Sequence, residues 1–222
     1  MKLAEASERG KILDIIDITP LINSKIAVFP GDTPFSQEFL MSTDSGQHLT
    51  LSRMTTTVHL GAHTDAPNHY GAKSESIESR SLDYYIGPCQ VIQVNIPRSE
   101  RIQSRDIKNI EIKAPRILFK TLSYPNPYQW KDDFNSLSGE LIQYLFNSGV
   151  QLVGIDTPSI DPATDKTLES HLCVHKNNMA ILEGIVLDHV SEGVYELIAL
   201  PLKIEGADAT PVRAILRTKK EF

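Results

Sequence analysis

The sequence predicts one α/β domain, and three observations lead to this prediction. The chain has 222 residues, a length typical of a single domain that buries a sizeable core. Residues 138–147 have the apolar periodicity of a helix, and the strand-like segment 150–155 follows directly. No linker rich in proline, glycine or serine divides the sequence. We therefore expect a single domain over residues 1–222, with the polar residues 1–11 as a loose tail.

The first half of the chain contains short β-branched segments separated by turn signals. Residues 12–18 predict a strand, because isoleucine and leucine dominate the segment and a Thr-Pro pair stops it. Residues 30–34, Pro-Gly-Asp-Thr-Pro, are typical of a turn. Residues 49–58 predict a strand because they include three consecutive threonines and a valine. The length and branching of residues 91–96 favour another strand.

The second half contains the clearer helices. The strongest is 138–147, because its leucine, isoleucine and phenylalanine side chains fall on one face and Gly149 stands where a C-terminal cap belongs. Ser104 is typical of an N-cap and predicts a short helix over 104–110. The other expected elements are strands at 116–120 and 150–155, a loop at 124–135, a helix at 170–177 and a strand at 195–200.

Composition limits the classes of function. With 22 Lys and Arg against 28 Asp and Glu, the formal charge is −6, so nucleic acid and anionic membranes are not expected partners. The hydrophobic content of 41% and charged content of 23% fit a soluble globular protein. Cys89 and Cys173 are too few for a disulfide framework or a cysteine-rich zinc site, and they fit a cytoplasmic location. The N-terminus lacks the apolar core of a secretory signal, and no apolar run approaches the ~18 residues of a membrane span.

Metal-binding side chains are concentrated in residues 59–69, which hold His59, His63, Asp65 and His69. Imidazole and carboxylate groups suit zinc or manganese. A β-branched segment precedes these residues and a proline follows, so a strand is favoured over a helix. A straight strand would separate His59 and His63 by about 13 Å, which is too far for one ion. We therefore expect a bend at Gly61, whose missing side chain also leaves room for a ligand.

Each candidate also has an ordinary interpretation. A single histidine is more often structural or exposed than a ligand, but the pattern His-x3-His-x-Asp with another polar candidate nearby favours a metal site. His171 and Glu183 stand among apolar neighbours, and a buried glutamate is costly unless it is paired or binds a metal. Taken alone, Glu183 is better explained by an exposed position on an amphipathic element. Other residues are interpreted as loop or surface residues and not as ligands: Asp156, Asp161, Asp165, His48, His175 and His189.

Residues 59–69, His-Leu-Gly-Ala-His-Thr-Asp-Ala-Pro-Asn-His, resemble a family signature. The pattern His-x-Gly-[Thr/Ala]-His-x-Asp-x-Pro-x-His is that of the metal-dependent cyclase family, which includes bacterial kynurenine formamidases (arylformamidases) and isatin hydrolases. Three further blocks are similar to the formamidases and extend the resemblance over nearly the whole chain: residues 30–35, residues 154–159, and the end at 200–204 through 211–214.

The resemblance implies a site with two divalent metal ions, usually zinc, with manganese possible. Its implied ligands are His59, His63, Asp65, His171 and Glu183. Asp65 would bridge the two ions, and Glu183 would touch both. His69 matches the general acid/base of the family and would stay off the metal. Ligating histidines must be unprotonated, so we expect acid to release the ions.

The resemblance also implies the fold and the reaction. The fold is a compact α/β domain with a mixed β-sheet and flanking helices, of the swivelling β/α/β kind, and members are commonly homodimers. The reaction is hydrolysis of N-formyl-L-kynurenine to L-kynurenine and formate in tryptophan degradation, by a metal-activated water with His69 as proton carrier. The enzyme class would be a metal-dependent amidohydrolase acting on linear amides.

One departure from the family pattern keeps alternatives open. Kynurenine formamidases commonly carry a substrate-contacting Trp just before the Pro-Gly-Asp-Thr block, and Phe29 stands there in this chain. Phe29 can still stack on an aryl ring and is the expected substrate-binding residue, without an indole N–H. A related hydrolase such as isatin hydrolase is the first alternative, and a non-catalytic metal-binding module is the second. The only tryptophan, Trp130, is expected either to help cover the site or to pack.

Overall fold

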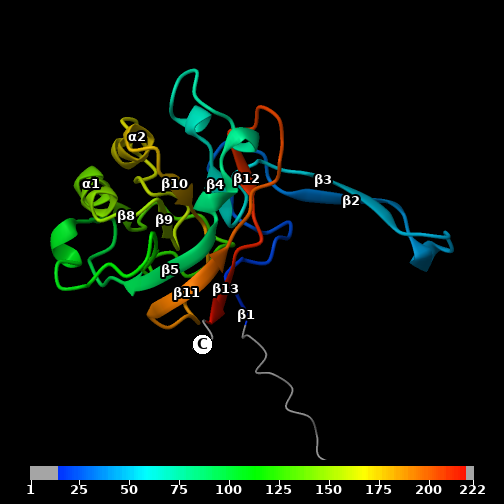
Figure 1. Ribbon diagram of the computed structural model, residues 1–222. Coiled ribbons are helices and arrows are strands. Elements are labelled where there is room, and N and C mark those ends of the chain that lie inside the picture. The colour runs from blue at the N-terminus through cyan, green and yellow to red at the C-terminus, as the bar shows by residue number, and fades with distance from the viewer. Residues whose placement is uncertain (1–14, 219–222) are drawn as a thin grey trace, which may run out of the picture.

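The computed structural model describes residues 15–218, and a seven-stranded mixed β-sheet forms its centre (Figure 1). In spatial order the strands are β1 (Ile15–Asp17), β13 (Ile215–Thr218), β11 (Gly193–Ile198), β5 (Ile86–Gln93), β7 (Arg116–Lys120), β9 (Leu152–Ile155) and β10 (Ala180–Leu182). Neighbours from β5 to β10 run parallel, whereas β1, β13, β11 and β5 pair antiparallel. The parallel half is built from strands with helical crossovers, as the α/β pattern of the sequence predicts.

Both faces of the sheet are buried, because successive side chains of a strand point to opposite faces. On β7, Ile117 and Phe119 join one core cluster while Leu118 joins the other. The first cluster lies under the helices α1 (Gly139–Asn147) and α2 (Glu169–Lys176), which pack against each other. The second is covered by loops and by the segment that carries the metal-binding motif, including the fully buried Ala62.

Smaller elements surround the central sheet. Three two-stranded pairs are β2 (Ser36–Met41) with β3 (Leu51–Thr55), β4 (His63–Asp65) with β12 (Ala209–Pro211), and β6 (Arg101–Ile102) with β8 (Ser136–Leu137). Residues 15–218 also contain five short 3-10 helices: η1 (Thr43–Ser45), η2 (Pro67–His69), η3 (Ile77–Ser79), η4 (Leu82–Tyr84) and η5 (Ser104–Asp106). None of the helices in the described residues is long and apolar enough to cross a membrane.

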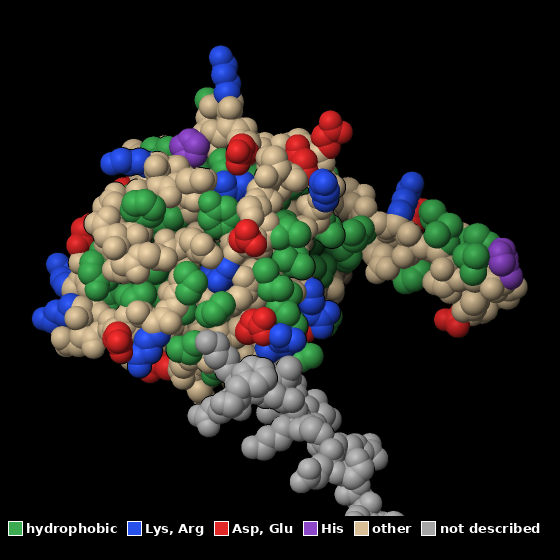
Figure 2. Space-filling model, viewed as in Figure 1, with side chains coloured by type: hydrophobic (Ala, Val, Ile, Leu, Met, Phe, Trp, Pro, Cys, Tyr) green, Lys and Arg blue, Asp and Glu red, His purple; other side chains and the backbone are tan. Residues whose placement is uncertain are grey.

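The β2–β3 hairpin projects away from the body as an arm (Figure 1). Apolar side chains lie along this arm in Figure 2. Five of them are strongly exposed: Phe39, Leu40, Leu49, Leu51 and Met54. An isolated hairpin is marginally stable in water, so exposed apolar residues on one mark a surface that is expected to be covered.

The predicted fold class, a compact α/β domain with a mixed sheet and flanking helices, is confirmed. The strand at 116–120 agrees with β7, and the helix at 138–147 agrees with α1 apart from its first residue, Ser138, which is the N-cap. The strand predicted at 12–18 contains β1, and residues 12–14, like the expected tail at 1–11, lie outside the described residues. The predicted loop at 124–135 contains no helix or strand.

Two expected elements differ from the structure. The helix predicted over 104–110 is wrong, since only the 3-10 turn η5 forms there. Ser104 does not cap it, because the Ser104 hydroxyl donates to the carboxylate of Glu140 on α1. The strand predicted at 91–96 begins earlier, at Ile86, because pairing with β11 continues through Gly87 and Pro88. Pairing with β11 therefore outweighs the tendency of Gly87 and Pro88 to interrupt a strand.

Candidate metal centre

The motif 59–69 folds around the short strand β4, which lies between two other segments. On one side, His63 N donates to Glu183 O over 3.0 Å and Glu183 N donates to His63 O over 2.9 Å. On the other side, β4 pairs with β12, with Ala209 opposite Asp65. Between the two ligand candidates of β4, Thr64 points elsewhere and its hydroxyl donates to the carbonyl of Ile181 over 2.6 Å. Since alternate residues of a strand share a face, His63 and Asp65 face the site together.

Two glycines allow this close packing. Gly61 has φ +56°, and the chain bends there, as the spacing of His59 and His63 predicts. Gly184 has φ +64°, and a Cβ on it would collide with the carbonyl oxygen of Gly61. Only glycine accepts both the left-handed backbone and this approach. The turn after Glu183 and the turn before His63 therefore pack directly against each other.

Asp65 lies at the centre of the cluster, with a histidine on each side of its carboxylate. Its Oδ1 is 3.1 Å from Nδ1 of His59 and 3.5 Å from Nε2 of His63. Its Oδ2 is 3.4 Å from Nε2 of His171, which stands on α2. The two oxygens thus face different groups, and this is the arrangement that a bridging carboxylate needs.

Glu183 closes the cluster from the end of β10. Its Oε2 lies 3.2 Å from Nε2 of His63, and its Oε1 lies 3.6 Å from Nε2 of His171. The same Oε1 accepts a hydrogen bond of 2.7 Å from the backbone N–H of Ile160, which fixes the carboxylate. Glu183 is 2% exposed, so the exposed position that its sequence context allows is excluded.

The donor set fits divalent metal ions. Within the described residues, neither carboxylate oxygen of Asp65 accepts a hydrogen bond of ordinary geometry, although Asp65 is only 2% exposed. A buried carboxylate without partners is costly, unless it binds a cation. Ligand atoms lie within 4.8 Å of one another in two sets that share this residue: His59, His63 and Asp65, and Asp65, His171 and Glu183. Nitrogen and carboxylate oxygen are suitable donors for zinc or manganese.

The electrostatics of the cluster favour positive charge. Burial alone lowers the pKa of His171, but Asp161 and Asp65 outweigh it and raise the pKa to about 10. Burial likewise opposes protonation of His59, and Asp65 with Asp208 raises its pKa to about 9. For Asp65, burial pushes the pKa up, yet the His171 and His59 rings beside its carboxylate hold the pKa well below its usual range. The carboxylates therefore attract cations, either protons or metal ions.

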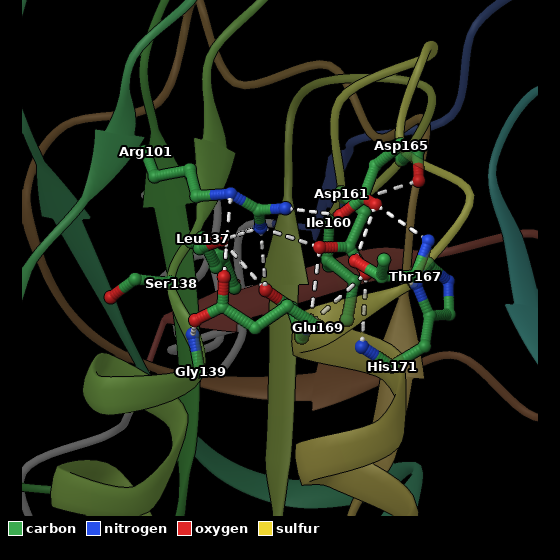
Figure 3. Close-up of polar contacts among 12 residues, drawn as sticks. Arg101, Leu137, Ser138, Gly139, Ile160, Asp161, Asp165, Thr167, Glu169 and His171 are labelled. Carbon is green, nitrogen blue, oxygen red and sulfur yellow. Dashed lines mark hydrogen bonds and ion pairs between the residues drawn. The ribbon is translucent and has the colours of Figure 1, made fainter.

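A second layer of contacts holds His171 in place (Figure 3). Asp161, which is fully buried, accepts from Nδ1 of His171 over 2.7 Å and from its backbone N–H over 3.1 Å. Arg101 reaches from β6 and donates to Asp161 and to Asp165, each over 2.5 Å. A carboxylate on Nδ1 orients a ligating imidazole and leaves Nε2 for the ion. Sequence reasoning treated Asp161 as an ordinary loop residue and missed this role.

His69 lies at the rim of the cluster, at the end of η2. Its side chain is 35% exposed, and its ring centroid is 4.3 Å from that of His59 and 6.2 Å from that of His171. Neither of the two sets around Asp65 includes it. Its Nδ1 lies 3.2 Å from Oδ2 of Asp208, a residue that sequence reasoning did not single out. The only available signal for Asp208 was its place between the two C-terminal blocks at 200–204 and 211–214.

The cluster opens into a cavity of about 620 Å³. Its far wall is aromatic and includes Phe29, Tyr124 and Trp130. The Phe29 and Trp130 rings meet edge to face with centroids 5.2 Å apart, and Phe29 is 45% exposed. Trp130 therefore lines the cavity as well as packing. Lys166 is the one Lys or Arg among the described residues that line it.

The remaining histidines and loop aspartates lie away from the metal-binding sets. His175 contacts Ser74, and His189 contacts Asp188 and the backbone of residue 17. His48 is exposed near the tip of the arm. Asp156 lines the cavity but binds the N–H groups and hydroxyl of the 121–123 turn. In the described part of the chain, none of these residues belongs to a group that could hold a metal.

Comparisons with solved structures identify proteins of the same fold. The chain is similar to a "predicted metal-dependent hydrolase" from Bacillus stearothermophilus, with 26% identity, TM-score 0.80, and coverage of 94% of this chain and 100% of that one. It shares the fold of an isatin hydrolase bound to the product analogue thioisatinate, at 20% identity and TM-score 0.81, over 94% and 93% of the two chains. Isatin hydrolase A from Labrenzia aggregata also has this fold, at 20% identity and TM-score 0.78, over 94% of each chain.

A family model matches residues 16–162, more than half of the chain. The match includes the whole motif 59–69 and ends before His171 and Glu183, which the structure brings to the same place. The chain therefore belongs to the Cyclase family.

Proposed function

We propose that this chain is a metal-dependent amide hydrolase that converts N-formyl-L-kynurenine and water to L-kynurenine and formate. The observation that carries the proposal is the cluster in which two potential ligand sets share Asp65, beside a cavity with aromatic lining and with the partly exposed His69 at its rim. The similarity to a metal-dependent hydrolase of 26% identity supports the coarser part of the proposal. Two ions are proposed, zinc first and manganese second, because the donors are imidazole and carboxylate.

Five residues would hold the ions. His59 and His63 would serve one ion and His171 the other, with Asp65 and Glu183 common to both. When bound, divalent ions of this kind supply a water of lowered pKa and polarise a substrate carbonyl. Arg101 and Asp161 keep His171 oriented. The backbone pairing of His63 with Glu183 keeps those two ligands together.

His69 is proposed to carry the proton. Its Nδ1 is directed at Asp208, so Nε2 is left to act toward the substrate. It would take a proton from the attacking water and deliver it to the departing aryl amine. Its partial exposure lets the ring exchange protons with solvent.

The cavity supports an aryl substrate with a charged tail. Phe29 and Trp130 offer an edge and a face on which an aryl ring can pack. Lys166 lies on the cavity wall and could pair with the carboxylate of the amino-acid chain of formylkynurenine. Isatin lacks that carboxylate. The isatin hydrolases that share the fold make isatin the second candidate substrate.

A hydrolysis assay tests the proposal. Purified protein is incubated with N-formyl-L-kynurenine or isatin, with and without chelator, followed by addition of zinc or manganese. We expect faster turnover of formylkynurenine, loss with chelator and recovery with metal. Preference for isatin would support the second candidate, whereas metal binding without hydrolysis of either compound would support a non-catalytic module.

A homodimer is also proposed, with the arm as part of the interface. Among the exposed arm residues, Phe39 is 62% and Met54 is 69% exposed, and a second copy of the chain would bury them. Light scattering should give a mass of about twice 24.7 kDa. The double variant Phe39→Ser and Met54→Ser should lower it to the single-chain mass, while Ser52→Ala on the same arm should not. A monomeric wild-type protein would reject the dimer.

A further inference from the structure

One carboxylate outside the two ligand sets contacts two of the site histidines. Oδ2 of Asp208 lies 3.1 Å from Nε2 of His59 and 3.2 Å from Nδ1 of His69. The two rings are tilted by 46° with centroids 4.3 Å apart, so the same oxygen reaches both. Asp208 is therefore placed between a candidate metal ligand and the candidate proton carrier.

The position of Asp208 is set by the backbone. It immediately precedes β12, and its carbonyl accepts from Ala66 N over 2.8 Å, continuing the pairing of β12 with β4. The preceding residue, Ala207, accepts from Ile77 N over 3.0 Å. Two hydrogen bonds to different segments thus hold the loop, and the Asp208 side chain leaves it toward the histidines.

The chemistry of a carboxylate determines which proton each ring carries. An aspartate is ionised at neutral pH and can only accept hydrogen bonds, so each ring nitrogen that faces it must carry the hydrogen. His59 is then protonated on Nε2. In the metal-loaded protein a ligating His59 has only Nδ1 left for the ion, and this atom lies 3.1 Å from Oδ1 of Asp65. His69 is protonated on Nδ1, which leaves the lone pair on Nε2 for proton transfer.

We propose that Asp208 is a positioning residue that selects the tautomers of both His59 and His69, so that one ring presents Nδ1 to the metal and the other presents Nε2 to the substrate. This inference rests on the proposed hydrolytic function for its role in turnover. The tautomers themselves can be measured without substrate. Asp208 has a counterpart in Asp161, which faces Nδ1 of His171, but Asp161 acts on a single ring.

A competing possibility is that Asp208 binds a metal itself. Its carboxylate and the rings of His59 and His69 form a third set of atoms within 4.8 Å of one another. The geometry favours tautomer selection, because Nδ1 of His59 already faces Asp65 and a metal on Nε2 would require one imidazole to bind two ions. The experiment below separates the two possibilities.

The test uses four variants of the full chain, and a fifth, His69→Gln, for spectral assignment. Asp208→Asn and Asp208→Ala remove the acceptor-only carboxylate, and Asp208→Glu retains it. Glu205→Gln is the matched control, since it removes the same charge from an exposed position three residues away. Metal content is measured for each metal-loaded protein. Long-range 15N–1H spectra of labelled protein report the tautomer of each of the 7 histidines, and the His69→Gln spectrum assigns the His69 signal.

We expect wild type and Glu205→Gln to show His69 protonated on Nδ1. In Asp208→Ala, His69 should shift toward the Nε2–H form that a neutral imidazole generally prefers in water. The kcat should fall about 10- to 100-fold in Asp208→Asn and Asp208→Ala, with KM within about threefold, and Asp208→Glu should recover part of the loss. A general structural defect would instead affect the alanine and glutamate variants alike.

Three results would overturn the inference. One is an unchanged His69 spectrum in both Asp208→Asn and Asp208→Ala. Another is turnover of both variants equal to that of Glu205→Gln. The third is complete loss of one ion even at saturating metal concentration, which would make Asp208 a ligand, because a lost positioning contact only weakens the affinity for that ion. If wild type hydrolyses neither substrate, the proposed function fails, and the histidine spectra still decide the tautomer inference.

Discussion

The candidate centre has an inner and an outer half that differ in burial and support. The inner half, Asp65, His171 and Glu183, is 2–3% exposed and stands on β4, α2 and the end of β10. The outer half, His59, His69 and Asp208, stands on loops or loop-like turns and is partly open to solvent. Rigid, dry carboxylates suit the retention of cations, whereas partly exposed groups can exchange protons. The comparison indicates that the inner half serves ion binding alone, whereas the outer half combines one candidate ligand, His59, with the proposed proton carrier, His69.

The largest loss of metal and of turnover is expected on substitution of Asp65, the residue that both ligand sets share. Asp65→Asn should deplete both ions and abolish turnover, since a neutral amide cannot bridge two cations. Metal content by mass spectrometry and hydrolysis of formylkynurenine measure the two effects. Glu205→Gln serves as the control for a lost negative charge. Retention of both ions would remove Asp65 from its bridging position.

The next largest effect is a loss of turnover without loss of metal, on substitution of His69 in the outer half. His69→Ala should reduce turnover about 10²-fold or more while metal content stays unchanged, because the ring belongs to neither set around Asp65. His175→Ala is the matched control, as this histidine contacts Ser74 and lies outside the metal-binding sets. If the ions are lost together with activity, His69 is a ligand and the division between the halves is wrong.

A smaller loss of metal affinity is expected on substitution of Asp161, which orients His171 of the inner half. Asp161→Asn should weaken binding of the ion that His171 would hold by about 10- to 100-fold, because the amide is a poorer acceptor for the N–H of His171 and a poorer partner for Arg101. Titration of the metal-free protein with zinc gives both affinities. Equal weakening of both ions would mean that the buried network supports the whole cluster and not only His171.

The smallest effect concerns the cavity wall. Lys166→Ala should raise KM for formylkynurenine a few-fold and leave KM for isatin unchanged, because a single exposed ion pair contributes at most about 1 kcal/mol. Lys176→Ala, exposed on α2, is the control. The difference should shrink at high salt. An equal rise for both substrates would exclude recognition of the carboxylate by Lys166.

Sequence reasoning recovered the fold where local signals were strong. The apolar pattern of residues 138–147 fits a helix, and that of residues 116–120 fits a buried strand; both elements form there. It failed at 104–110, where the Ser104 hydroxyl binds Glu140 and does not cap a helix. It also missed β2 and β12, because each is held by a partner strand and carries little periodicity of its own. It favoured a strand for the metal-binding motif but did not give the bounds of β4.

The residues of the candidate site also differ in how far the sequence predicts them. The sequence alone predicts the cluster of His59, His63 and Asp65, because all three lie within seven consecutive residues. His171 and Glu183 were assigned only by resemblance to a family. Asp161 and Asp208 were not assigned at all, and Asp208 is separated from His59 by 149 positions.

The sequence by itself determined the α/β class, the bend at Gly61 and the local group of potential ligands, because these depend on composition and on neighbours within a few residues. The tertiary structure alone decided which carboxylates face which ring nitrogens. That choice depends on the parallel order of β7, β9 and β10, on the pairing of β4 with β12, and on the contact between Gly61 and Gly184. These are long-range contacts, whose partners no local pattern specifies.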